Sequence, residues 1–119
     1  ADDIPAQEIF GERQGDVLVV GWGSTFGAIR TAVQRHRRED RAVAHLHLRY
    51  LNPMPHNVGD LLHGFRRVLI PELNLGQLSL LLRARFLIDA VGLHKVAGQP
   101  FRIAEVYDKI SEVHTMVER

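Results

Sequence analysis

The sequence contains no cysteine, no long apolar run and no marked excess of charge of either sign. Without cysteine, this chain forms no disulfide, supplies no thiolate to an iron–sulfur cluster and builds no cysteine-based zinc site. No apolar stretch approaches the ~20 residues needed to cross a bilayer. Lys and Arg number 15 against 14 Asp and Glu, a balance that argues against a general nucleic-acid binder. We therefore expect neither a membrane nor a nucleic acid as partner.

The length and composition predict one folded domain. A chain of 119 residues with 45% apolar residues is of the usual domain size and apolar enough to bury a core. The chain begins with Ala1 and carries no visible signal peptide, so we expect a cytoplasmic protein that is processed or cut from a longer one. Residues 1–15, which include Pro5, Gly11 and Gly15, are predicted to be a linker from a preceding domain. Residues 16–119 are predicted to be the domain itself.

Aliphatic runs alternate along the chain with patterns of helical period. Residues 17–20 form a continuous aliphatic run, as expected for a parallel strand covered on both faces. Asn57 and Asp60 are predicted to be a capping pair for a short helix. Strands are expected at 17–20, 42–48, 67–70 and 89–96, with helices after 24, after 57, at 75–86 (well buried) and at 103–117. This order predicts a three-layer α/β/α sandwich with a mainly parallel sheet and room for one antiparallel edge strand.

The first predicted strand runs into a turn that carries glycine, and this turn opens a helix. Its residues that are candidates for an anion-binding or interface turn are Gly21, Gly23, Ser24 and Thr25. Ser24 is expected to cap the helix, and free backbone N–H groups at such a start attract anions. With Gly27 the spacing is G-x-G-x-x-x-G, one residue longer than the dinucleotide fingerprint.

Arg49 stands where that fingerprint wants an acidic residue for a ribose hydroxyl. An arginine there suits a 2′-phosphate, so a stand-alone NADP-type nucleotide-binding module remains the alternative function.

Two histidines, His45 and His47, lie two residues apart and therefore on one face of the second strand. Such a pair can chelate a metal, but no third ligand stands near it in the sequence. We expect a structural pair, with its hydrogen bonds satisfied, at a sheet edge or an interface. No metal site is predicted.

Polar side chains also gather at the end of the third predicted strand, in the loop that holds Glu72, Asn74 and Gln77. The carboxyl ends of parallel strands are where α/β proteins place functional groups. In the alternative interpretation, Asn74 caps the next helix and Glu72 accepts hydrogen bonds from loop amides. Both interpretations stay open at this point.

Large apolar residues occur at the turns near the strand ends. Such residues on a small domain often mark an interface. The interface candidates are Trp22, Tyr50, Leu51 and Met54.

The sequence is similar to the transketolase C-terminal-like domain of thiamine-diphosphate enzymes. The similarity lies in four segments in this order: 17–25, 48–55, 67–77 and 91–101. The sequence most resembles the alpha subunit of 2-oxoacid:ferredoxin oxidoreductases, above all the 2-oxoglutarate type, over about residues 16–112. The resemblance implies an enzyme that oxidatively decarboxylates a 2-oxoacid to an acyl-CoA and reduces ferredoxin. It also implies thiamine diphosphate, Mg, coenzyme A and iron–sulfur groups in the parent enzyme.

The resemblance places the cofactor machinery of such an enzyme in other domains. This chain has no Gly-Asp-Gly metal motif and no cysteine. We therefore expect a non-catalytic organising domain that binds no cofactor itself and has no catalytic residue. Its expected partners are the preceding domains of the same subunit, a thiamine-diphosphate-binding beta subunit and a second copy in a homo-oligomer.

Overall fold

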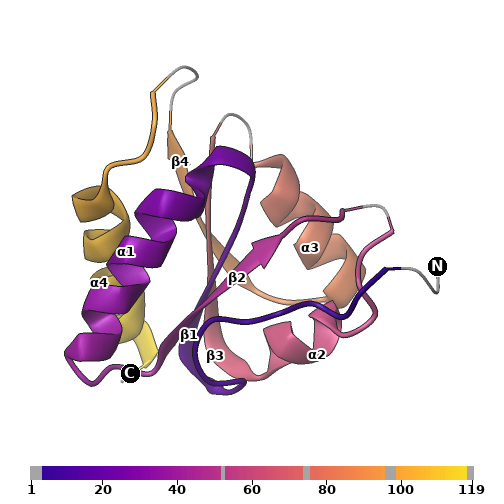
Figure 1. Cartoon of the computed structure of the whole chain (residues 1–119), viewed down its shortest axis with the longest axis horizontal. Helices are drawn as coiled ribbons and strands as arrows, with labels where there is room; N and C mark the ends of the chain where they lie inside the picture. Colours follow the sequence, from indigo (N-terminus) through magenta and orange to yellow (C-terminus); the bar gives the residue numbers. More distant parts are fainter. Residues whose placement is uncertain (1–3, 52, 74–75, 96–98, 118–119) are drawn as a thin grey trace.

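Four parallel strands form the centre of the fold, in the order β2-β1-β3-β4 (Figure 1). They are β1 (Gly15–Trp22), β2 (Val43–Leu48), β3 (Phe65–Leu73) and β4 (Ala90–Lys95). The structure is a computed structural model, and it describes residues 4–51, 53–73, 76–95 and 99–117. β1 lies inside the sheet because the aliphatic run 17–20 is fully buried, and only a strand covered on both faces tolerates such a run.

Helices cover both faces of this sheet (Figure 1). On one face lie α1 (Phe26–Arg38), which follows the short 3₁₀ turn η1 (Gly23–Thr25), and α4 (Ile103–Val117). On the other face lie α2 (Val58–His63) and α3 (Gln77–Phe86). The predicted three-layer α/β/α sandwich is therefore confirmed.

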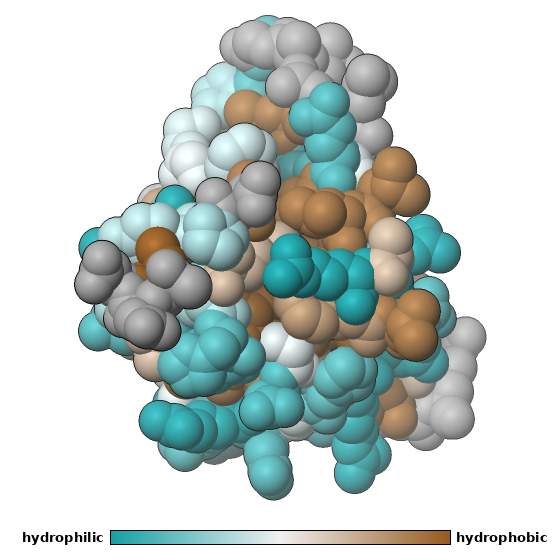
Figure 2. Space-filling model, turned by 90° about the vertical axis from the view of Figure 1, so that its right-hand side faces the viewer, coloured by the Kyte–Doolittle hydropathy of each residue, from teal (hydrophilic) through white to brown (hydrophobic). Residues whose placement is uncertain are grey.

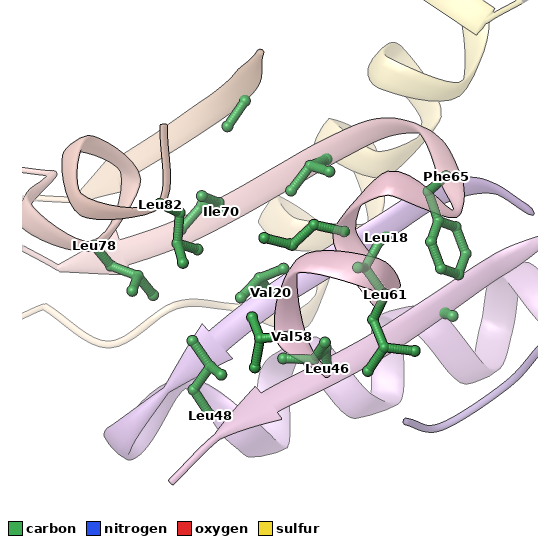
Figure 3. Packing of buried hydrophobic residues seen from close by; sticks show 14 of the residues in the cluster. Leu18, Val20, Leu46, Leu48, Val58, Leu61, Phe65, Ile70, Leu78 and Leu82 are labelled. Carbon is green, nitrogen blue, oxygen red and sulfur yellow. The ribbon is translucent and has the colours of Figure 1, made fainter. Parts of the chain in front are cut away.

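The core on the α2–α3 face consists of aliphatic side chains from alternate strand positions (Figure 3). Leu18 and Val20 of β1, with Leu46 of β2, point toward the helices because successive side chains of a strand alternate between faces. Val58 and Leu61 of α2 pack onto them. Burying each such side chain stabilises the fold by about 1.5–3 kcal/mol.

The outer edge of β2 is covered by the segment that precedes β1. Phe10 forms an isolated antiparallel bridge with His45, with backbone N–H groups donating in both directions at 2.9 Å. Within the described ranges, the antiparallel pairing at this edge is limited to that bridge. The backbone N–H of Gln7 donates to Asn57 Oδ1 (2.7 Å), and Asn57 Nδ2 donates to the Gln7 carbonyl (3.0 Å). Asn57 occupies the N-cap position of α2, as predicted, but its side chain binds Gln7 and makes no cap hydrogen bond.

α3 differs from the well-buried helix that its sequence predicted. It buries Leu78 and Leu82 against the sheet, but Leu80 is 71% exposed and Leu81 40%. A helix on the outside of a sheet buries one side only, and no described residue of this chain covers the other. Figure 2 views the side of the molecule that carries α2 and α3, and apolar side chains gather there. No helix in the described part of the chain is both long and apolar enough to span a membrane.

Candidate functional site

The glycine turn after β1 is a closely packed junction. A Cβ atom at Gly21 would lie 2.5 Å from Ile29 Cδ1 and 2.8 Å from Thr25 Oγ1, so only glycine lets β1 approach α1 this closely. Gly23 has a φ of 66°, a left-handed conformation that favours glycine. The two glycines are thus explained by packing and backbone geometry.

Ser24 does not cap α1, so that prediction is wrong. The chain enters α1 through η1, which puts Thr25 at the N-cap position without a side-chain cap bond. The Thr25 hydroxyl donates instead to the Trp22 carbonyl (3.0 Å), while Ser24 is exposed. An anion-binding or interface role for residues 21–25 remains a prediction.

Glu72 is buried at the end of β3, where its carboxylate holds the first turn of α3. Oε1 accepts from the Leu78 N–H (2.8 Å) and Oε2 from the Ser79 N–H (2.9 Å). A carboxylate at a helix N-terminus satisfies amides that have no partner within the helix and interacts favourably with the helix dipole. The structure thus favours the amide-binding interpretation of Glu72. Gln77 is exposed, and Asn74 lies outside the described residues.

The four interface candidates differ in exposure. Trp22 and Tyr50 are 42% and 43% exposed, Leu51 is half-buried, and Met54 is buried in the α2–α3 core. Met54 therefore does not belong to an exposed patch. Phe26, which the interface prediction missed, is 38% exposed. The interface role of the set stays a prediction.

A cavity of about 380 Å³ lies between β2, the start of α1 and the segment 5–10. We call it the edge pocket. Arg30, Arg49 and the rings of His45 and His47 line it, and Glu8, which is exposed, is its acidic residue. The glycine turn is not part of its lining.

Arg30 is fixed in the edge pocket from three sides. Its guanidinium carbon lies 4.1 Å from the ring centroid of Phe10 and 4.6 Å from that of Phe26, distances at which a cation is attracted by an aromatic ring. Its Nε–H donates to His45 Nδ1 (3.0 Å). Burial lowers the pKa of Arg30. Across the described residues, neither Arg30 nor Arg49 forms an ion pair with a carboxylate.

His45 and His47 form the close pair that the sequence predicted, with ring centroids 6.1 Å apart and both rings against Phe26. Contrary to expectation, each ring keeps one unsatisfied nitrogen: His45 Nε2 and His47 Nδ1 are buried and have no hydrogen-bond partner among the described residues. Burial, aided by the charge of Arg30, lowers the pKa of His45 to about 3. Burial and the nearby Arg49 lower the pKa of His47. The His45 ring is therefore neutral at neutral pH.

Only some residues of the edge pocket are candidates on the sequence alone. Arg49, His45 and His47 were visible as candidates, but Arg30 and Phe10 were missed. Phe26 and Arg30 are four apart on α1 and so share a face, which is a weak signal. Phe10 comes from the segment predicted to be a linker.

Two arginines and two histidine rings line the edge pocket. No group of three His, Asp or Glu that could hold a metal ion exists in the described part of the chain.

Comparison with known proteins matches residues 15–106 to the model of the pyruvate:ferredoxin oxidoreductase core domain II. Among curated proteins, the subunit KorA of 2-oxoglutarate oxidoreductase from Mycobacterium tuberculosis is 47% identical over 91 residues. That match covers 76% of this chain and 14% of KorA. The chain therefore spans about one seventh of the length of this relative.

Solved structures agree with this result. The 2-oxoglutarate:ferredoxin oxidoreductase from Magnetococcus marinus, solved with 2-oxoglutarate, coenzyme A and succinyl-CoA bound, superposes with a TM-score of 0.88 at 31% identity. The match covers 95% of this chain and 20% of that one. A split-gene transketolase, an inactive beta4 tetramer, matches 100% of this chain and 45% of its own with a TM-score of 0.67 at 17% identity, which supports the fold alone.

Proposed function

Because the chain belongs to the pyruvate:ferredoxin oxidoreductase core domain II family, we propose that it is the organising and interface domain of a 2-oxoacid:ferredoxin oxidoreductase alpha subunit. The proposed parent enzyme decarboxylates a 2-oxoacid oxidatively to an acyl-CoA, with 2-oxoglutarate as the proposed substrate. The proposed domain comprises residues 16–119, and residues 1–15 are the proposed linker. The parent is proposed to be cytoplasmic.

The observation that carries this proposal is the apolar outer side of α3. Leu80, Leu81 and Leu87 are 71%, 40% and 88% exposed, and Figure 2 looks onto the side of the molecule that carries this helix. Exposed apolar side chains that gather on a small domain mark an interaction surface. We propose that the preceding domains of the same subunit, or its thiamine-diphosphate-binding beta subunit, cover this side.

The donor groups of this chain do not fit the metal and cluster cofactors of such an enzyme. An iron–sulfur cluster needs thiolate ligands, and the sequence has no cysteine. The described residues contain no group of three His, Asp or Glu that could hold a metal ion by protein side chains alone. We propose that thiamine diphosphate, Mg and the clusters are held by other domains or subunits.

The stand-alone NADP-type module is not favoured. Family membership accounts for the fold, and packing against Ile29 accounts for Gly21, the first glycine of the supposed fingerprint.

Two measurements test the proposal. The isolated chain should give no 2-oxoglutarate-dependent dye reduction with thiamine diphosphate, Mg and coenzyme A, and turnover would refute the non-catalytic role. In the full-length subunit, co-expressed with its beta subunit, Leu80→Asp combined with Leu87→Asp should reduce assembly, measured by light scattering after size exclusion. Arg38→Asp, a charge change at an exposed position on the opposite face of the sheet, serves as control. Full assembly of the double variant would refute the interface.

A further inference from the structure

We propose that the edge pocket binds the phosphoryl group of a small phosphorylated molecule, with Arg30 and Arg49 as the cations that hold it. This site is separate from the glycine turn, and the inference does not depend on the proposed function.

His45, in the wall of the edge pocket, has a donor without a partner among the described residues. His45 is completely buried, and its Nδ1 accepts the Nε–H of Arg30. A neutral imidazole has one donor and one acceptor nitrogen, so the proton of His45 lies on Nε2. That N–H has no partner in the described structure. Buried donors are nearly always paired, so an unpaired one calls for an explanation.

Beside this donor lies the charge of Arg30, which no carboxylate among the described residues compensates. The Arg30 guanidinium is held between Phe10 and Phe26, which fixes its position without neutralising it. Among the described residues, the Arg30 side chain donates one hydrogen bond, from Nε, so its Nη groups remain available to a ligand. A water molecule satisfies a donor but leaves the charge, whereas an oxyanion satisfies both.

The shape and the lining of the edge pocket suit a small ligand. A volume of about 380 Å³ falls in the range of small-molecule sites. Arg49 and Tyr50, both exposed at the end of β2, line the pocket where it opens. A phosphomonoester with a flat ring suits this lining, because its phosphate would pair with Arg30 and Arg49 beside the His45 ring and its flat ring would stack on Tyr50. Glu8 is the one lining acid, and its exposure lets solvent screen it.

The probes that test this proposal are inorganic phosphate, AMP and adenosine, each titrated into the whole chain at neutral pH. Histidine ring resonances in NMR report binding at the site. We expect phosphate and AMP to shift the His45 and His47 resonances with a dissociation constant of about 1 mM or tighter. Adenosine should bind at least about tenfold more weakly than AMP, because it lacks the group that the arginines recognise.

Variants decide which residues act. Arg30→Met should abolish the response to phosphate, and because this arginine packs between two rings, its folding is checked by circular dichroism. Arg49→Gln changes an exposed position, so this variant can be measured even if Arg30→Met unfolds. It should weaken AMP binding about tenfold. Arg38→Gln, at an exposed position at the far end of α1, should leave AMP binding unchanged. The proposal is refuted by unshifted His45 and His47 resonances, by equal affinity for adenosine and AMP, or by unchanged binding in a folded Arg49→Gln variant.

Discussion

Replacing Glu72 tests whether this strand-end carboxylate serves the fold or a function. In the structure its two oxygens accept the backbone N–H groups of Leu78 and Ser79 at 2.8 and 2.9 Å, and the side chain is 3% exposed. Glu72→Ala removes both bonds and leaves two buried amides at the start of α3 without a partner. Glu72→Gln keeps one acceptor but turns an N–H donor toward the second amide.

The magnitude follows from the charge and the burial. A hydrogen bond to a charged group contributes about 1.5–3 kcal/mol, and the favourable interaction with the helix dipole adds about 0.3–1 kcal/mol. Part of the loss is offset because the first turn of α3 can fray and hydrate. We therefore expect Glu72→Ala to lower the free energy of unfolding by about 3 kcal/mol, and Glu72→Gln by about 2 kcal/mol.

Urea unfolding followed by far-ultraviolet circular dichroism measures these changes, and an unchanged m-value makes them comparable. Glu112→Gln is the matched control, since this exposed glutamate pairs with Lys109 (3.2 Å) on the surface of α4. Its change should stay within about 0.5 kcal/mol. If Glu72→Ala is as stable as the control, the carboxylate does not hold α3, and the functional interpretation of Glu72 returns.

The remaining predictions concern glycines and pH. Gly21→Ala in β1 should lower the free energy of unfolding by about 1–3 kcal/mol through overpacking, whereas Gly27→Ala, in open space on α1, should raise it by about 0.5–1 kcal/mol; equal effects would contradict the packing at Gly21. Gly76→Ala should cost about 1–3 kcal/mol in the same urea assay, since φ is 74° and His94 Nε2 lies 2.6 Å from the added Cβ; a neutral change would contradict that strain. The folded-state pKa of His45 is depressed to about 3. As the pH falls, this histidine is therefore protonated first in the unfolded state. The free energy of unfolding should fall below pH ~6.5, by up to about 1.4 kcal/mol per pH unit, until the pH reaches about 3. His45→Gln should flatten that slope in urea titrations at several pH values, and an unchanged slope would show that this ring does not carry it.

The sequence by itself determined the layered fold. The aliphatic run 17–20 is readable because a strand covered on both faces needs apolar side chains at every position, and the alternation of strands and helices then requires a parallel sheet. Gly23 lies in the 3₁₀ turn after β1, as the sequence predicts, whereas Gly21 still belongs to β1. Local sequence patterns are enough to predict strands and helices, because the environment of each residue repeats along such an element.

Only the tertiary structure decided which side chains meet. Ser24 and Asn57 are good capping residues by type. The 3₁₀ turn before α1 contains Ser24, so Ser24 does not cap α1, and the side chain of Asn57 binds Gln7, fifty residues away. The edge pocket joins Arg30 to Phe10 and His45 from three separate segments. Contacts of this kind depend on which distant segments the fold brings together. The spacing of residues within one segment does not determine that.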